Sequence, residues 1–431
     1  MNYKQTLTWL YEQLPMFHRI GAAAYKADLS NTIELCENIG NPQLQFPSIH
    51  IAGTNGKGST SHYLASILQE AGYKTGLFTS PHLKDFRERI RINGRMIHKR
   101  EVTSFVNEQI KSLDAINPSF FEWTFGLAAW YFAKEKIEIA VIETGMGGRL
   151  DSTNIVIPVL TVITKIGLDH TKFLGKTLPA IAAEKAGIIK QNVPVIIGET
   201  QEETTPVFTE FAFRNNAPLV FADKQVVNSS YHFSETRLRR LIAYFISLNS
   251  GERYKINSPL AGKYQLKNLA TVLASIELLK DSGFNCTVSN IQNGVSHVIR
   301  NTGFIGRWQT LAKKPLSIAD IGHNPDGIRE IIENIKLTPH KKLHFVLGVV
   351  SDKDIDGMLA LLPREAIYYF CKADIPRALN AAELADVASN YFLKGSIYNS
   401  VKEAYEAART DAAHDDLVFI GGSTFVVAEV V

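Results

Sequence analysis

The residues with the most evident chemistry lie in a glycine-rich turn, IHIAGTNGKGST, at positions 49–60. An apolar strand runs into this turn, and a helix is expected to begin near Ser59. Glycines let a backbone approach a polyphosphate closely, and backbone amides at a helix N-terminus favour anionic oxygens. Lys57 would add a positive charge for the outer phosphates. The segment therefore predicts a phosphate-binding loop. The alternative, a glycine-rich turn with a solvated lysine, is disfavoured by the strand context and the GKGST run.

The turn departs from the usual G-x-x-x-x-G-K-[ST] pattern. Ile51 stands where the first glycine belongs, and Gly58 follows the lysine where a hydroxyl belongs. In these departures the turn resembles the ATP loop of the Mur ligase superfamily, and the extra glycine resembles its folate branch, the folylpolyglutamate and dihydrofolate synthases. The resemblance implies that ATP is bound by a run of loop residues, namely Thr54, Asn55, Gly56, Lys57, Gly58, Ser59 and Thr60.

Other polar residues follow apolar strands further along the chain. Glu143 lies near the end of such a strand in VIETGMGGRLDSTN, and His170 follows another. Open parallel sheets bind ligands at this edge, although a lone glutamate could be an ion-pair partner and a lone histidine a core residue. Lys185 lies on a helical pattern, where it could pair with neighbouring acidic residues or extend to solvent.

The segments 77–94, 141–154 and 163–190 resemble the same family, in the expected order. The resemblance implies two Mg²⁺ ions held by Ser80, Glu143, His170 and a carbamylated Lys185. Carbamylation requires the neutral amine, which burial promotes, and it yields an anionic oxygen ligand suited to magnesium. The resemblance further implies a folate site at Pro81 and His82 in TSPHL, which by itself would be a turn in most proteins.

The pterin is expected near Phe121 and Asp151. Phe121 would stack on the ring and Asp151 would accept from its amino-pyrimidine edge. For Phe121, one of two adjacent phenylalanines, core packing is an equal alternative.

Two later segments, GRWQ (306–309) and IADIGHNPDG (318–327), resemble the family's nucleotide-binding arginine and its D-x-A-H-N-P motif. Ile305 departs from the usual proline, and Ile321-Gly322 replaces a Gly-Ala pair. The resemblance implies nucleotide contacts from Asn268, Arg307 and Asp320, and a glutamate side lined by His323 and Ser423. Lys57, Lys185 and His323 are the expected catalytic residues. The site would straddle two domains whose closure gates catalysis.

The elements expected to position these residues alternate between strand and helix. Strands are predicted at 48–52, 74–79, 137–144, 159–164 and 193–198, with helices at 60–71, 125–134 and 178–190. The pattern then repeats on a smaller scale, with strands at 316–321, 343–350, 366–372 and 416–422 and helices at 326–335, 381–391 and 401–412. Such alternation is typical of α/β folds with a parallel sheet covered by helices on both faces.

We therefore expect an α/β protein of two domains, with the boundary in 296–306. Residues 1–297 would form a Mur-ligase-like P-loop ATPase domain that binds ATP and folate around a parallel-sheet core. Residues 298–431 would form a smaller, Rossmann-like α/β domain that serves as the glutamate-ligase domain. The smaller domain carries no G-x-G-x-x-G, so nothing marks it as a dinucleotide-binding domain.

Composition limits the partners. The chain has 431 residues with 46 basic and 43 acidic side chains, a balance that does not support binding to nucleic acid or a membrane surface. Three widely separated cysteines make a disulfide framework improbable. No secretory signal and no apolar run of roughly 18 residues is present. We expect a cytoplasmic, monomeric protein.

The reaction implied is amide ligation. ATP would phosphorylate the carboxylate of dihydropteroate, or of the terminal glutamate of a reduced folate, and L-glutamate would attack the acyl phosphate. Phosphoryl transfer asks mainly for positioning and charge neutralisation. The alternatives are a Mur-type peptide ligase of cell-wall synthesis, a simple P-loop kinase or GTPase, and a non-catalytic nucleotide-binding module. The sequence leaves open the folate form, the polyglutamate length and any monovalent cation dependence. GGRLDSTN resembles the bifunctional bacterial enzymes and favours both reactions.

Overall fold

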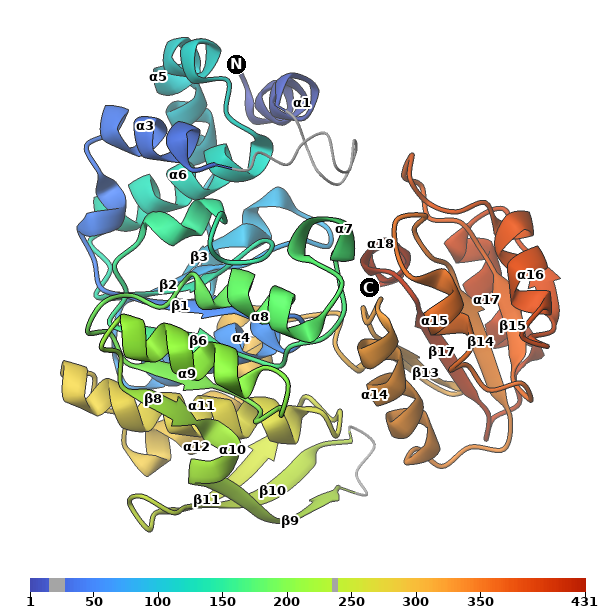
Figure 1. Ribbon diagram of the computed structural model, residues 1–431. Helices are drawn as coiled ribbons and strands as arrows, with labels where there is room; N and C mark the ends of the chain where they lie inside the picture. The colour runs from blue at the N-terminus through green and yellow to red at the C-terminus, as the bar shows by residue number, and fades with distance from the viewer. Residues whose placement is uncertain (15–27, 235–238) are drawn as a thin grey trace. The chain divides into compact units, whose positions relative to one another are not determined.

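The computed structural model describes residues 1–14, 28–234 and 239–431, which divide into two compact units (Figure 1). The first unit comprises Met1–His232, Ile242–Ser258 and Gln265–Gly303. The second comprises Phe233–Leu241, Pro259–Tyr264 and Phe304–Val431. The family resemblance, from about Leu14 to Val430, and the predicted range 1–297 also include residues 15–27 and 235–238, which lie outside the described residues.

The first unit is built on an eight-stranded sheet in the order β4-β3-β2-β5-β1-β6-β7-β8. The strands are β1 (Ser48–Ala52), β2 (Thr75–Phe78), β3 (Ile90–Ile92), β4 (Arg95–Met96), β5 (Ile139–Glu143), β6 (Leu160–Ile163), β7 (Val195–Ile197) and β8 (Leu219–Phe221). Every residue of β1 is buried, and β1 pairs in parallel with β5 and β6. The predicted strands of this sheet are confirmed, although four of them are one or two residues shorter at their ends.

Helices cover both faces of this sheet, as predicted. The α-helices of the unit are α1 (Tyr3–Gln13), α3 (Ser30–Asn38), α4 (Lys57–Glu70), α5 (Lys99–Ile116), α6 (Phe120–Lys134), α7 (Thr171–Leu174), α8 (Leu178–Ala186), α9 (Thr205–Arg214), α10 (Ala222–Gln225), α11 (Gln265–Leu279), α12 (Val288–Ser296) and α13 (Val298–Thr302). Helices α4 and α11 contact the strands from one side, while α8 and α9 lie on the other (Figure 1).

Helix α6 shows why the local sequence forms these elements. The Ser119 hydroxyl accepts a hydrogen bond from the Glu122 amide, and the Glu122 carboxylate accepts one from the Ser119 amide. This capping box satisfies backbone donors that a helix start leaves free. The helix then buries large side chains, including Trp123, Phe125 and Phe132. Full burial of a phenylalanine contributes roughly 1.5–3 kcal/mol, so packing on the sheet supplies most of the helix's stability. The cap explains why the helix begins at Phe120 and not at the predicted residue 125.

A three-stranded sheet, β11-β10-β9, was not predicted from the sequence. Its strands are β9 (Val226–Phe233), β10 (Leu241–Ser247) and β11 (Arg253–Ser258). Burial alternates along β10 and β11, as expected for a sheet with one face on the core.

The second unit contains a six-stranded sheet in the order β12-β13-β17-β14-β15-β16. Its strands are β12 (Gln309–Lys313), β13 (Leu316–Ala319), β14 (Leu343–Leu347), β15 (Ile367–Phe370), β16 (Gly395–Ile397) and β17 (Leu417–Gly421). Its α-helices are α14 (Pro325–Lys336), α15 (Ile355–Leu359), α16 (Ala381–Ser389), α17 (Val401–Asp411) and α18 (Thr424–Ala428). All pairs are parallel except the edge pair β12–β13. The predicted strands and helices of this unit are confirmed.

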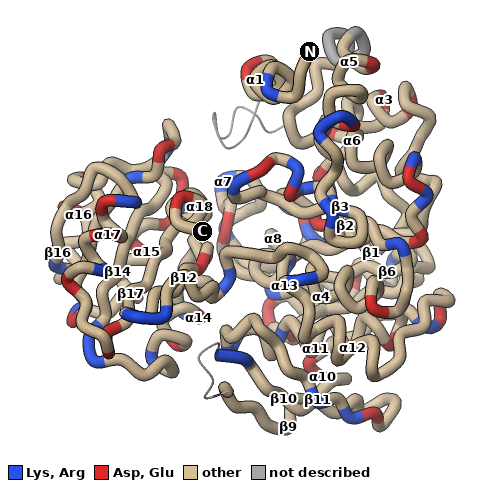
Figure 2. Tube along the Cα trace, turned by 180° about the vertical axis from the view of Figure 1, so that it is seen from behind, with Lys and Arg blue, Asp and Glu red and all other residues tan. Residues whose placement is uncertain are grey.

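Basic and acidic residues are interspersed along the trace of both units (Figure 2). Within residues 1–14, 28–234 and 239–431, no helix is both long and apolar enough to cross a membrane.

Candidate functional site

The predicted phosphate loop lies between β1 and α4, where two glycines have backbone conformations that L side chains rarely adopt. Gly53 has a φ of +148°, and a Cβ there would lie 1.8 Å from Thr164 Oγ1. Gly56 has a φ of +96°, and a Cβ there would lie 2.4 Å from Asn268 Oδ1. Only glycine fits both positions. Because Gly56 is the N-cap, α4 begins at Lys57 and not at the predicted residue near Ser59.

The loop is fixed to the segment that follows β6. The Thr54 amide donates to the Lys165 carbonyl at 2.8 Å, and the Thr54 hydroxyl donates to the Gly167 carbonyl at 3.0 Å. The Thr164 hydroxyl donates to the Asn55 carbonyl at 2.7 Å. These contacts hold the loop in shape without using the amides at the start of α4.

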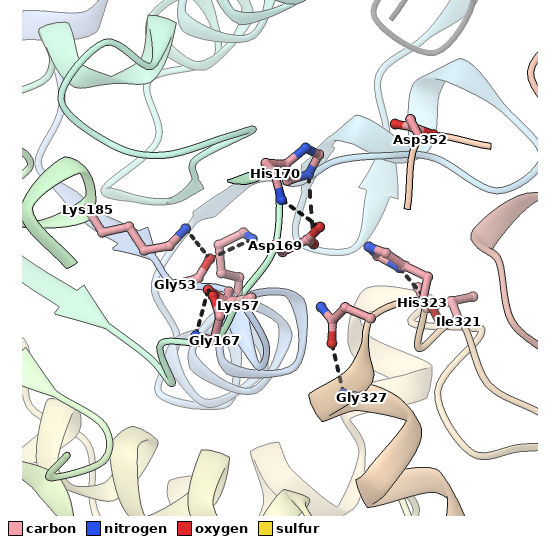
Figure 3. Close-up of polar contacts among 12 residues, drawn as sticks. Gly53, Lys57, Gly167, Asp169, His170, Lys185, Ile321, His323, Gly327 and Asp352 are labelled. Atoms are coloured by element: carbon pink, nitrogen blue, oxygen red, sulfur yellow. Dashed lines mark hydrogen bonds and ion pairs between the residues drawn. The ribbon is translucent and has the colours of Figure 1, made fainter. Parts of the chain in front are cut away.

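Two lysines meet at one carbonyl of this loop. The Nζ atoms of Lys57 and Lys185 each donate to the Gly53 oxygen at 2.9 Å, as Figure 3 shows. Lys185 is only 3% exposed. Burial, followed by the charge of Lys57, lowers the pKa of Lys185 to about 7, against smaller opposite effects of Asp169 and Asp151. The amine of Lys185 is thus available near neutral pH, and the side chain neither extends to solvent nor pairs with its acidic neighbours on α8.

Helix α8 brings Lys185 to the loop. Thr177 caps its start by accepting from the Ala180 amide at 3.3 Å. The helix was predicted to reach residue 190 but ends at Ala186. A Cβ on the following Gly187 would lie 2.4 Å from the Cβ of Arg149, so the chain there lies directly against the GMGGRLD loop. The Arg149 amide donates to the Glu184 carbonyl at 2.7 Å, which joins the two segments.

Acidic and imidazole side chains lie at the end of β5 and in the segment between β6 and α7. Glu143, the last residue of β5, is 4% exposed, and its Oε2 accepts from the Ser80 amide at 3.3 Å. His170 Nε2 lies 3.8 Å from Asp169 Oδ2, and the His170 amide donates to Asp169 Oδ1 at 2.8 Å (Figure 3). Across the part of the chain that the structure describes, no three His, Cys, Asp or Glu side chains form a group that could hold a metal ion. Any cation at this edge would depend on other ligands as well.

Phe121 lies on α6, and its ring covers the start of the loop after β5 that carries Asp151. A Cβ on Gly145 would lie 2.6 Å from Cζ of Phe121, so that ring covers Gly145. The Phe121 ring also packs on Phe78, with 5.8 Å between ring centroids. Asp151 Oδ2 accepts from the Met146 amide at 2.8 Å.

Asp151 is 5% exposed and organises its own loop. Its Oδ1 accepts from the amide and the hydroxyl of Thr153, and the Gly145 amide also contacts the carboxylate. A carboxylate has about four acceptor sites. A pterin edge would therefore have to displace one of these donors.

The segment after β2 contributes Pro81 and His82. Pro81 is exposed, while His82 is half-buried. Burial and then the neighbouring Arg89 lower the pKa of His82 to about 3, so the ring is neutral. His82 Nδ1 accepts from Arg89 Nε at 2.8 Å.

On the other side of the loop, helix α11 faces α4. Gln265 Nε2 donates to the Ser59 hydroxyl at 3.1 Å, and Asn268 Nδ2 donates to Gln265 Oε1 at 2.9 Å. Asn268 therefore borders the loop at Gly56. The buried hydroxyl of Thr60 has no hydrogen-bond partner among the described residues.

In the second unit, the predicted residues gather at the carboxyl ends of β13 and β17, which pair in parallel. Asp320 is 1% exposed and accepts from Gly322, from Trp308 at 2.9 Å and from the Tyr264 hydroxyl at 2.6 Å. Arg307 Nη1 lies 3.6 Å from Asp320 Oδ1. Asp320 thus connects several segments at the carboxyl ends of these strands.

His323 and Ser423 lie at the same edge of that sheet. His323 Nδ1 lies 3.0 Å from the Ile321 carbonyl, which can only accept, so the proton is on Nδ1. Asn324 caps α14 by accepting from the Gly327 amide at 2.8 Å, and Ser423 caps α18 by accepting from the Phe425 amide at 3.2 Å.

Sequence reasoning missed several contributors. Asp169 adjoins His170, and Gln265 opens α11 one turn before Asn268, so each lies beside a residue that the sequence had singled out. Arg89 and Tyr264 gave no local signal, because their roles depend on contacts with residues distant in the chain or on burial.

Comparisons with known proteins match two long segments of the chain to Mur ligase domains. Residues 51–276 match the family described as the Mur ligase middle domain, and residues 306–424 match the glutamate ligase domain of Mur ligases. The chain is 31% identical to a dihydrofolate synthase/folylpolyglutamate synthase of Bacillus subtilis, over 99% of this chain and 98% of the relative.

The chain is also 31% identical to a probable bifunctional folylpolyglutamate synthase/dihydropteroate synthase of Haloferax volcanii. That match covers all of this chain but only half the length of the relative. Among solved structures, Escherichia coli FolC in complex with DHPP and ADP superposes with a TM-score of 0.86 at 29% identity, over 100% of this chain and 97% of that one.

Proposed function

Because this chain belongs to the Mur ligase family, in its folylpolyglutamate synthase/dihydrofolate synthase branch, we propose that it uses ATP to join L-glutamate to dihydropteroate and to reduced folates. The observation that carries the proposal is the meeting of Lys57 and Lys185 at the Gly53 carbonyl. A simple nucleotide-binding loop needs Lys57 alone. A second, fully buried lysine whose pKa is about 7 is costly to keep and favours a reaction centre.

The reaction has two steps. A carboxylate oxygen of the acceptor attacks the γ-phosphorus of ATP, which forms an acyl phosphate and releases ADP. The amine of L-glutamate then attacks the acyl carbon, an amide bond forms, phosphate leaves, and the amine loses a proton. Lys57 and the free amides at the start of α4 would bind the phosphates, with Thr54, Asn55, Gly56, Gly58, Ser59 and Thr60 shaping the loop.

The donor atoms of the side chains that follow the strands are compatible with magnesium. Glu143 offers a buried carboxylate, and Ser80 and His170 offer an oxygen and a nitrogen. Mg²⁺ normally takes one or two protein ligands and completes its shell with waters and substrate phosphates, so the small number of acidic residues is compatible. When bound, two such ions would neutralise charge on the phosphates. Ser80, Glu143, His170 and a modified Lys185 would hold them.

Lys185 would take part as a carbamate. Its neutral amine adds to CO₂, a C–N bond forms and one proton is released, which leaves an anionic carboxylate on Nζ. An unmodified ammonium at Lys185 would repel a divalent cation bound by Glu143 and His170. The lowered pKa of Lys185 supports the modification because it makes the required neutral amine common.

In the second unit, we propose that Arg307 and Asp320 bind the nucleotide and that His323 and Ser423 bind L-glutamate. In its neutral form with the proton on Nδ1, His323 would accept a proton at Nε2 from the ammonium group of glutamate and help to form the attacking amine. Asn268, at the loop, would contact the adenine side of the nucleotide.

The pterin would bind at Phe121 and Asp151, with Pro81 and His82 nearby on the segment after β2. The partly buried Phe121 ring can offer a face for stacking, although it also packs on Phe78. Asp151 would release one of its loop donors on binding, so it acts as both a loop organiser and a pterin acceptor.

The proposal includes both folate reactions in one monomeric, cytoplasmic enzyme. Product formation from dihydropteroate and from tetrahydrofolate, each with ATP, magnesium and L-glutamate, tests it. The expected result is a glutamyl product from both substrates. Nucleotide binding without any product would support a non-catalytic module, and activity on a nucleotide-linked peptide precursor alone would support a cell-wall ligase.

A further inference from the structure

Arg89 is a buried cation with most of its hydrogen-bond donors unused. The side chain is 2% exposed. Its Nε donates to His82 Nδ1 at 2.8 Å, and its guanidinium lies over the Phe120 ring at 5.4 Å. Within residues 1–14, 28–234 and 239–431, neither terminal nitrogen has a hydrogen-bond or ion-pair partner. A guanidinium carries five N–H donors, so four remain for a ligand.

The carboxylates around Arg89 are engaged elsewhere. Asp85 pairs with Arg87 at 2.6 Å. Glu88 accepts from the amides of Leu83, Lys84 and Asp85. Glu143 accepts from Ser80. A buried, unpaired charge is strongly unfavourable, so the arrangement is expected to be completed by an anion that the described residues do not supply.

The position of Arg89 indicates which anion. Arg89 ends the 3-10 helix Phe86–Arg89 and immediately precedes β3, which runs antiparallel to β2. It therefore lies at the edge of the sheet where β1, β5 and β2 end. The Thr79 amide donates to its carbonyl at 3.1 Å. Across this edge the order is Arg89, Ser80, Glu143 and Gly53, with neighbouring strands roughly 4.8 Å apart.

The phosphate loop thus lies about three strands away, or roughly 14 Å. The carboxylate that attacks the γ-phosphate must lie close to that loop. An arginine fork on that carboxylate would also lower its nucleophilicity. Arg89 is better placed for a second carboxylate on the same acceptor, and its free fork suits bidentate carboxylate recognition.

We propose that Arg89 binds the α-carboxylate of the glutamyl residue that a folate acceptor carries, and so determines the use of folates over dihydropteroate, which lacks that group. This inference rests on the proposed function. It makes Arg89 a specificity-determining residue and gives the enzyme a reason to keep a buried cation beside the folate-site segment.

The test compares Arg89→Gln and Arg89→Lys with the wild type and with Arg87→Gln, which removes a neighbouring cation already paired with Asp85. Arg89→Gln should raise KM for tetrahydrofolate at least tenfold, which corresponds to about 1.4 kcal/mol. KM for dihydropteroate and for L-glutamate should change less than twofold. Arg89→Lys, which keeps the charge but loses the fork, should give a smaller loss with the same selectivity. Arg87→Gln should leave KM for tetrahydrofolate and KM for dihydropteroate at their wild-type values.

Equal losses for both acceptors, or a loss confined to L-glutamate, would overturn the assignment. If Arg89→Gln does not fold, Arg89→Lys carries the same comparison. Calorimetric binding of dihydrofolate and dihydropteroate, which differ only in the glutamyl residue, provides a readout without turnover. A wild type that turns over neither acceptor refutes the proposed function. The ratio of the affinities for dihydrofolate and dihydropteroate, compared between the wild type and Arg89→Gln, still decides the role of Arg89.

Discussion

The buried amine of Lys185 leads to a quantitative prediction about carbamylation. With a pKa of about 7, roughly three quarters of these amines are neutral at pH 7.5, whereas an ordinary lysine is neutral in about one molecule per thousand. Lys185 should therefore react with CO₂ several hundred times more readily than a solvent-exposed lysine, and occupancy should rise as the pH increases through about 7.

The assay is ¹³C NMR of the protein in ¹³C-bicarbonate with magnesium and ADP. One carbamate signal is expected in the wild type and none in Lys185→Ala. Lys190→Ala is the matched control, because Lys190 also has its pKa lowered by burial and donates to a carbonyl, that of Asn154 at 2.8 Å. The control should keep the signal. A wild type without a carbamate signal at saturating bicarbonate, or a signal that persists in Lys185→Ala, would refute the reasoning. In Lys185→Ala, activity should be lost and partly restored by a small carboxylate in the buffer.

Three further predictions concern the same region. Lys185→Met should stabilise the protein in CO₂-free buffer by about 3–5 kcal/mol near pH 7, because the lysine binds a proton in the unfolded state that the native state disfavours. In urea unfolding, the free energy of unfolding of the wild type should rise between pH 7 and 10.5, and that of the variant should not. Lys57→Ala should abolish turnover at saturating ATP, because the loop amides alone do not neutralise the outer phosphates. The control Lys74→Ala, which removes a half-exposed ion pair with Glu135, should keep wild-type rates, and equal steady-state activity of the two variants would contradict the prediction. Asp151→Ala should raise KM for both pterin substrates and leave ATP affinity, measured by calorimetry, nearly unchanged. The variant should also lose about 1–3 kcal/mol of stability, because loop amides are left without a partner. Unchanged pterin kinetics would place the pocket elsewhere.

Much of the fold could be predicted because its signals are local. The apolar runs of β1, β5 and β6 are short, rich in β-branched residues and buried on both faces, and each is followed by a polar or glycine-rich segment. The order of these segments placed Glu143 and the phosphate loop at one edge of a sheet, which the structure confirms. The antiparallel edge strands β3 and β4 and the small sheet β9–β11 were missed because their alternation is weak and their pairing partners are set by tertiary contacts.

The site residues were harder to predict than the strands. The contact of Lys185 with Gly53 joins residues 132 positions apart, so nothing in the AEKAGI segment reveals how deeply the amine is buried. Arg89 lies within the segment 77–94 but was not singled out, because its unused donors become evident only when Asp85 and Glu88 are seen to be engaged elsewhere. The full set of loop contacts made by Asp151 was likewise not foreseen.

In the proposed reaction, ATP phosphorylates the carboxylate of the acceptor, and the acyl group is then transferred to the amine of glutamate. Dihydropteroate labelled with ¹⁸O in its carboxylate, incubated with the enzyme, ATP, magnesium and L-glutamate, tests it most directly. One ¹⁸O atom is expected in the released inorganic phosphate for each dihydrofolate formed. Dihydrofolate formed with unlabelled phosphate would contradict it.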